Sequence, residues 1–267
     1  MLTYIARRII QGVIVIVAVS ILCFTIFRFM GDPVVSMAGQ YATQNEIEMV
    51  RKSLGLDKPM VAQYGHFVWN ALHGNFGKSY VSRVDALGLI IERFPASFEL
   101  AATAMIIAFS LGLSLGVLVS LKPYIFRNRL IMAGSLGGIS IPTFFTGILL
   151  IMVFAVYLGI LPPFGRGETV RVGFWRTGYL TFDGLKHLLL PAMTLAMYQL
   201  AVLLRLTRAG MREVLAEEYI KTAWAKGLAP AKVIFKHALR NVLIPVVTIA
   251  GLQFGELIAG SIVTETI

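Results

Sequence analysis

The chain alternates between long apolar runs and shorter polar stretches. The apolar runs approach or exceed the roughly twenty residues that cross a bilayer, and they cover residues 9–27, 98–121, 130–161, 188–204 and 242–262. The third holds thirty-two residues without a charge. We therefore expect it to tilt, to kink near Pro142, or to begin parallel to the membrane surface. The pattern predicts an all-α, polytopic transmembrane helical bundle with five visible spans.

Composition places the chain in a membrane. Hydrophobic residues make up 57% of it and charged residues only 14%, whereas soluble domains carry about a quarter charged residues. The net charge of +10 does not require a nucleic-acid partner, because Lys and Arg gather in the cytoplasmic loops of membrane proteins. Arg7 and Arg8 put the N-terminus in the cytoplasm. The first apolar run is longer than the core of a signal peptide, so we expect an uncleaved span.

Three regions follow from this pattern. Residues 1–30 hold the N-terminal end and first span, residues 31–94 form a polar external segment, and residues 95–267 form the core membrane domain. Within the core domain, the cytoplasmic stretch 206–241, here called the coupling loop, is dense in charge. From Arg205 to Arg240 there are eight Lys or Arg against three Glu, which a lipid-spanning segment cannot hold.

The coupling loop has the pattern of a helix, a turn and a short second helix. Gly227 ends the first helix, and Pro230 stands where a new helix takes its first residue. Beyond it, apolar residues recur at i, i+3, i+4 and i+7, the stripe of an amphipathic helix; these are Ala231, Ile234, Phe235 and Ala238. We predict that this stripe serves to dock a cytoplasmic partner.

The same stretch resembles the EAA loop of ABC-transporter permease subunits. The resemblance rests on Glu218-Tyr219, Thr222-Ala223, Ala225-Lys226-Gly227-Leu228, His237-Ala238-Leu239-Arg240-Asn241 and Ile244-Pro245. The eighteen positions from Gly227 to Pro245 and the Ala-Lys-Gly-Leu core are similar to the dipeptide/oligopeptide branch. The resemblance covers essentially the whole chain and implies a permease fold of the type I ABC-importer kind. It also implies a sixth span, which the 267 residues given do not contain.

The resemblance further implies partners and roles. The expected partners are a second homologous permease subunit, two cytoplasmic ATPase subunits that bind the ATP and magnesium, an external solute-binding protein, and membrane lipid. This chain itself would need no cofactor. Gly227 would give the turn, Glu218 would meet a basic ATPase surface, and Tyr219 or Leu228 would fill its groove. The expected coupling residues are Glu218, Tyr219, Thr222, Ala223, Lys226, Gly227, Leu228 and Arg240.

Polar residues within the spans are candidates for a translocation path. Ionisable side chains there are costly and usually face the bundle interior or a cavity. Glu256 and Gln253 lie three residues apart in the last run, on one helical face, and Glu99 lies near the outer end of the second. Each has an alternative reading as a hydrogen-bonding residue between helices or to the partner permease.

Other local patterns point to packing or turns. Small residues in the third run would let helices approach closely; they are Gly134, Ser135, Gly137, Gly138, Ser140 and Gly147. The end of His73-Gly74-Asn75-Phe76-Gly77-Lys78-Ser79 looks like a phosphate-binding loop, but Leu72 stands where that motif needs a glycine. The resemblance to peptide-type permeases instead implies an external Gly-x-Phe-Gly turn here. The four histidines are scattered and Cys23 is the only cysteine, so no metal site is predicted.

No catalytic motif is present in the sequence, so we expect a transport subunit rather than an enzyme. The reading is an importer permease for short peptides in the bacterial plasma membrane, energised by separate ATPases. Permeases for glutathione or nickel chelates remain alternatives within the same family branch. A stand-alone secondary transporter or channel is the alternative from another class; it would show inverted repeats, and no internal repeat is evident. An intramembrane enzyme ranks third.

Overall fold

The computed structural model describes residues 2–29, 43–53, 56–79, 84–121 and 125–265. The chain divides into two compact units, residues 1–91 and 92–267. Part of the predicted external segment 31–94 lies outside the described residues. Four helices are long and apolar enough to cross a membrane, or five if one bent helix pair counts as a single span, among the described residues. The expectation of a polytopic helical bundle is confirmed.

Helices make up most of the described part of the first unit. They are α1 (Leu2–Phe29), α3 (Gln44–Ser53) and α4 (Met60–Leu72), followed by the start of α5 (Ala86–Leu121). Phe24 of α1 packs edge-on against Tyr64 of α4, with ring centroids 5.6 Å apart. The Tyr64 hydroxyl lies 2.7 Å from that of Ser20. Gln63 closes the turn before α4, because its Nε2 donates to the Lys58 carbonyl at 2.6 Å.

The segment that resembles a phosphate loop is a turn. Gly74 and Gly77 both have positive φ, 79° and 77°, a conformation that only glycine adopts without strain. Lys78 then forms an antiparallel bridge with Asp85, and the Ala86 N–H donates to the Gly77 carbonyl at 2.9 Å. The chain thus turns back toward the start of α5, in agreement with the expected Gly-x-Phe-Gly turn.

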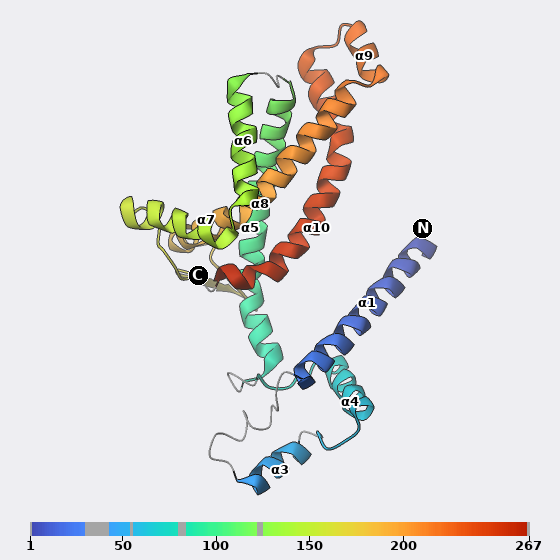
Figure 1. Ribbon diagram of the computed structural model, residues 1–267, viewed down its shortest axis with the longest axis vertical. Helices are drawn as coiled ribbons and strands as arrows, with labels where there is room; N and C mark the ends of the chain where they lie inside the picture. The colour runs from blue at the N-terminus through green and yellow to red at the C-terminus, as the bar shows by residue number, and fades with distance from the viewer. Residues whose placement is uncertain (1, 30–42, 54–55, 80–83, 122–124, 266–267) are drawn as a thin grey trace. The chain divides into compact units, whose positions relative to one another are not determined.

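The second unit is organised around α8 (Phe182–Leu215), which contacts α6, α7, α9 and α10 (Figure 1). Its contact with α5 is a close backbone approach. Small buried residues recur every fourth position on α5, so they line one face of that helix; they are Ala104, Ala108, Gly112, Gly116 and Ser120. A Cβ added to Gly116 would lie 2.6 Å from Thr207 Cβ and 2.9 Å from the Leu204 carbonyl oxygen. Only glycine fits there.

The third apolar run breaks at Pro142, one of the outcomes expected from its length. Helix α6 (Phe126–Ser140) ends there, and α7 (Thr143–Leu150) with the π-helical turn η1 (Ile151–Tyr157) leaves at 111°. Proline lacks the N–H that would continue the ladder and constrains the preceding residue. The small residues predicted to bring helices together here do so only in part. A Cβ added at Gly147 would lie 3.4 Å from Thr194 Cγ2, whereas nothing lies within 4 Å of a Cβ added at Gly134 or Gly137.

A β-hairpin precedes α8. Strands β1 (Val170–Val172) and β2 (Trp175–Thr177) pair antiparallel, with Val172 opposite Trp175. Gly173 has φ of 64° in the connecting turn. Helix α8 begins at Phe182, six residues before the apolar run that predicted it, because the Thr181 hydroxyl caps it by accepting from the Gly184 N–H at 3.0 Å. The apolar pattern does not predict this first turn, because the turn contains polar residues.

Candidate functional site

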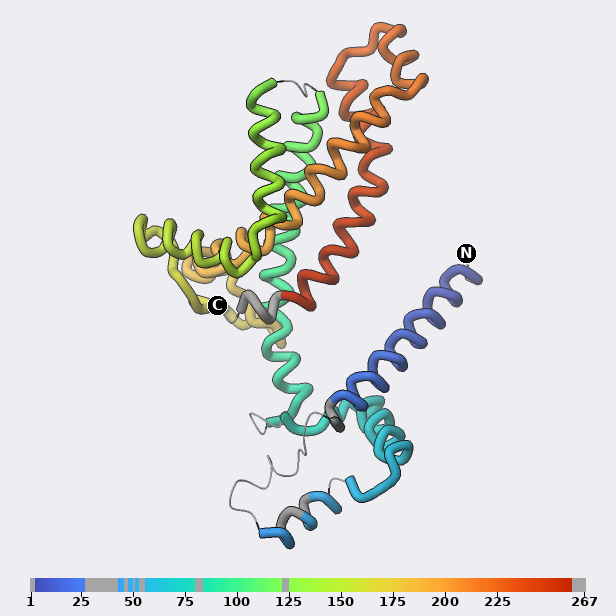
Figure 2. Tube along the Cα trace, in the orientation of Figure 1, coloured from blue at the N-terminus to red at the C-terminus, as the bar shows by residue number. Residues whose placement is uncertain are grey.

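The coupling loop folds as a compact turn at the far end of α8. After α8 the chain forms α9 (Glu218–Ala225) and then reverses into η2 (Lys232–Ala238) and α10 (Leu239–Glu265) (Figure 2). The reversal is a Schellman motif. The Gly227 N–H donates to the Trp224 carbonyl at 2.9 Å, and the Leu228 N–H reaches the Ala223 carbonyl at 3.4 Å. Gly227 has φ of 70°, as this motif requires.

The second helix of the coupling loop begins at Pro230, as the sequence predicts. The prediction that it is a separate short helix is wrong, because helix continues without a break from residue 230 to 265. Its first part, η2, is π-helical, a wider turn with i to i+5 hydrogen bonds that joins the start of the helix to α10. The predicted fifth span therefore extends directly from the coupling loop.

The π-helical turn also changes which residues are buried. Val233 and Ala238, five positions apart, are both fully buried, as the i to i+5 repeat of a π-helix would place them. Of the predicted stripe, Ala238 is buried and Ile234 is half-buried, while Ala231 and Phe235 are exposed. A period of 3.6 was the wrong one for this turn. Val233 and Ala238 join Ile220 and Ala223 of α9 in the main hydrophobic core.

The remaining predicted coupling residues divide into a buried and an exposed set. Leu228 packs against the core beside Ala223, so both hold the turn in place. The exposed set consists of Glu218, Tyr219, Thr222, Lys226 and Arg240. Glu218 is paired with Lys221 at 2.7 Å, and the Tyr219 hydroxyl accepts from Asn241 Nδ2 at 2.6 Å. Trp224 is also exposed, at 42%, and sequence reasoning missed it.

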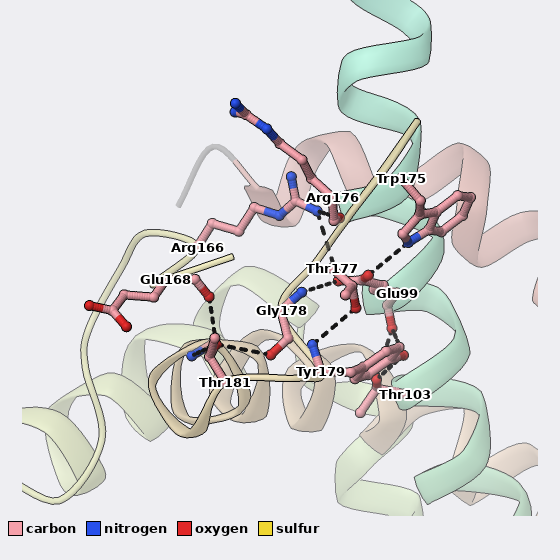
Figure 3. A network of polar contacts seen from close by, with 11 residues as sticks. Glu99, Thr103, Arg166, Glu168, Trp175, Arg176, Thr177, Gly178, Tyr179 and Thr181 are labelled. Atoms are coloured by element: carbon pink, nitrogen blue, oxygen red, sulfur yellow. Dashed lines mark hydrogen bonds and ion pairs between the residues drawn. The ribbon is translucent and has the colours of Figure 1, made fainter. Parts of the chain in front are cut away.

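At the other end of α8 the structure brings a polar cluster together around Glu99 of α5 (Figure 3). The Glu99 carboxylate is buried, with 3% exposure. It accepts from the indole Nε1–H of Trp175 at 2.9 Å and from the Gly178 N–H at 3.1 Å. The Arg166 guanidinium lies 3.8 Å from its second oxygen. All three partners come from the hairpin loop, residues 162–181, so one carboxylate ties that loop to α5.

The backbone of Glu99 takes part as well. Its carbonyl accepts from the Tyr179 hydroxyl and from the Thr103 hydroxyl, each at 2.8 Å. Burial raises the pKa of Tyr179 above its usual 10; the hydrogen bond between the Tyr179 and Thr103 hydroxyls lowers it in part, and the nearby Glu99 carboxylate raises it. Tyr179 therefore remains a hydrogen-bond donor at neutral pH.

Further contacts fix the shape of the hairpin loop. Arg166 donates to the Arg176 carbonyl at 2.5 Å, and the Thr181 hydroxyl donates to the Glu168 carbonyl at 2.6 Å. The Trp175 ring packs edge-to-face on Phe98 of α5, with centroids 5.6 Å apart. Phe98 in turn contacts Phe254 of α10 at 5.7 Å. The loop is thus connected to two helices of the core.

The three residues predicted for a translocation path occupy different environments. The Glu99 carboxylate is hydrogen-bonded to Trp175 and Gly178 of its own chain. This favours the alternative reading of Glu99 as a hydrogen-bonding residue between elements. Gln253 is buried, and its Oε1 has no hydrogen-bond partner among the described residues. Glu256, three residues further along the same face of α10, is exposed. Their contact with substrate stays a prediction.

Among the described residues, no group of three His, Cys, Asp or Glu side chains could hold a metal ion. The two candidate sites therefore consist of the coupling loop and the Glu99 cluster. They lie at opposite ends of α8, whose 34 residues correspond to about 50 Å at 1.5 Å per residue.

Sequence comparison decides the family. Residues 111–267 match the binding-protein-dependent transport system inner membrane component family, and residues 1–101 match its N-terminal region. The chain belongs to this family. The resemblance to peptide-type ABC permeases seen in the coupling loop is confirmed, and it extends over both units.

Several curated relatives match over the whole chain. The chain is 42% identical over 282 residues to the di/tripeptide transport system permease protein of Pseudomonas aeruginosa, covering 84% of that protein. It is 38% identical over 284 residues to the dipeptide transport system permease protein of Escherichia coli, again covering 84%. It is 40% identical over 268 residues to the glutathione transport system permease protein of Escherichia coli, covering 82%.

Proposed function

We propose that this chain is the permease subunit of an ATP-driven importer that moves short peptides across the plasma membrane. The observation that carries the proposal is the construction of the coupling loop. Its apolar side, formed by Ile220, Ala223, Val233 and Ala238, is built into the core, while charged and aromatic side chains remain exposed beside the Gly227 turn. A push on the exposed side is therefore transmitted to α8 and α10.

ATP and magnesium bind to separate ATPase subunits in this proposal. The exposed side of the coupling loop offers them both charge and apolar surface. Glu218 is 87% exposed and pairs with the exposed Lys221, so it is available to a basic partner surface. Tyr219 and Trp224 are 44% and 42% exposed and supply the aromatic area that protein interfaces favour.

The topology that we propose follows from charge. The coupling loop lies in the cytoplasm, because the stretch from Arg205 to Arg240 carries eight basic residues against three acidic ones. The N-terminus lies there too, because Arg7 and Arg8 precede the first span. The hairpin loop at the opposite end of α8 then faces outward. A second homologous permease subunit completes the pathway, and it would cover Glu256, whose exposure on an apolar helix is costly in lipid.

Short peptides are the substrate class that the relatives favour. Two of the three proteins named above are peptide permeases, and the third carries glutathione, itself a short peptide derivative. Their identities to this chain are too similar to separate these substrates. We propose di- and oligopeptides, with glutathione as the alternative; external delivery by a solute-binding protein would set the choice.

The test varies Gly227 in the tagged, full-length chain extracted from its native membrane. Gly227→Pro removes the N–H that caps α9 and forbids the positive φ, whereas Gly227→Asn tolerates that conformation. We expect ATPase subunits to co-purify with the unchanged chain and with Gly227→Asn, and to be lost with Gly227→Pro. Recovery of the chain without any ATPase would contradict the proposed function.

A further inference from the structure

The tip of the hairpin loop presents exposed arginine and aromatic side chains. Phe174 is 78% exposed and Val172 is 55% exposed, and Arg171 and Arg176 are exposed beside them. Figure 3 shows the Arg176 side chain extending away from the Glu99 cluster, although its backbone carbonyl takes part in it. The surface formed by Arg171, Val172, Phe174 and Arg176 is here called the hairpin tip.

Hydrogen bonds to Glu99 of α5 hold the hairpin tip in place. Trp175 and Gly178 both donate to the buried Glu99 carboxylate, and Trp175 lies between Phe174 and Arg176 in the chain. The Arg171 Nε donates to the Gly173 carbonyl at 3.0 Å, which closes the turn. A surface that is already ordered loses little conformational entropy when a partner binds.

The excess of arginine in the hairpin loop favours an acidic partner. Residues 162–181 contain three arginines and one glutamate, although short external loops tend to be poor in basic residues. Arg166 is balanced by Glu99. Glu168 offsets one of the other two arginines, so the loop keeps a net positive charge. Arg171 and Arg176 are both exposed, at the end of the unit that the proposed topology places outside.

We propose that the hairpin tip is a docking surface for an acidic face of the external solute-binding protein. Arginine binds carboxylates through paired hydrogen bonds, and arginine and aromatic side chains are enriched where interfaces bind most strongly. Glu99 acts as a positioning residue that holds the tip in its docking geometry. The inference rests on the proposed function, and the family's binding-protein-dependent transport supplies the partner.

The experiment measures binding of the system's own solute-binding protein to the assembled complex in nanodiscs of zwitterionic lipid. Charge reversal by Arg176→Glu should weaken binding about tenfold at low salt, mainly through slower association, and less as salt is added. Arg176→Lys should weaken binding less than Arg176→Glu does, because it keeps the charge but loses the paired hydrogen bonds. Arg129→Glu makes the same reversal at the start of α6, on the proposed cytoplasmic side, and should have no effect.

A second variant tests the positioning role of Glu99. Glu99→Gln replaces one acceptor oxygen by a donor facing other donors, so the loop should loosen. Trypsin cleavage after Arg171 and Arg176 should then become faster, and binding should weaken with both arginines still present. The exposed Glu92 on the same helix gives the matched control, Glu92→Gln, which should change neither.

Unchanged affinity in Arg176→Glu would overturn the inference, as would an equal loss in Arg129→Glu. So would a loss that appears only when anionic lipid is present, because the tip would then be a lipid contact. In each of these cases the proposed function stands, provided that the unchanged complex contains ATPases and binds the solute-binding protein. If the unchanged complex binds no solute-binding protein at all, both the inference and the proposed function fail.

Discussion

Replacement of Gly116 by alanine tests the close packing of α5 against α8. The added Cβ would lie 2.6 Å from Thr207 Cβ and 2.9 Å from the Leu204 carbonyl oxygen, so backbone must move. Overpacking of this kind costs about 1–3 kcal/mol, against a gain of about 0.5–1 kcal/mol from replacing a helical glycine. Gly134→Ala on α6 is the matched control, because nothing lies within 4 Å of its added Cβ and only the gain applies.

The assay is thermal unfolding of the purified chain in one detergent. The two variants should differ by about 2 kcal/mol, which corresponds to roughly 4–8 °C in a chain of this size, with Gly116→Ala the less stable. If Gly116→Ala unfolds at the same temperature as Gly134→Ala, the close approach of α5 and α8 is wrong, and with it the packing of the core.

Three further changes test other parts of the structure. Val233→Ala should destabilise the chain by about 1–3 kcal/mol in thermal unfolding, since its side chain is fully buried; Phe235→Ala, at 61% exposure, should weaken only ATPase co-purification. Glu99→Ala should cost about 1–3 kcal/mol for each buried donor left unpaired and speed trypsin cleavage of the hairpin loop. The raised pKa of Tyr179 means that the folded loop prefers the neutral phenol. Its contribution to stability should persist below pH 10 and fall as pH rises through the raised pKa, seen as a change in Trp175 fluorescence that Tyr179→Phe abolishes.

Much of the fold could be predicted because membrane spans are long and their signals are local. Apolar length located the span-forming helices, and Pro142 marked the break in the third run, since both depend on backbone hydrogen bonding. Gly227 and Pro230 marked the ends of the helices in the coupling loop for the same reason. The π-helical turn was missed because it leaves no such mark in the residues. With its five-residue repeat, Val233 and Ala238 are buried in the core, while Ala231 and Phe235 of the predicted docking stripe remain exposed.

The Glu99 cluster could not be predicted, because its members are far apart in the sequence. Sequence reasoning identified Glu99 as an unusual acid near the end of a span, but its hydrogen-bond donors Trp175 and Gly178 lie 76 and 79 positions away. Nothing in the spacing of Trp175 or Gly178 points to it. The GxxxG spacing of Gly112 and Gly116 was, by contrast, readable in the sequence as a close-packing motif.

Site-directed cross-linking tests the central claim, that the coupling loop docks an ATPase, most directly. Cys23 is the only cysteine of the chain, so Cys23→Ser gives a clean background for Glu218→Cys or Phe235→Cys. With a short bifunctional reagent in native membranes, both positions should cross-link to an ATPase subunit, and the extent should change when ATP is added. The same reagent should give no such product with Ile90→Cys on α5. A transport-competent complex in which neither coupling-loop position reaches an ATPase would contradict the claim.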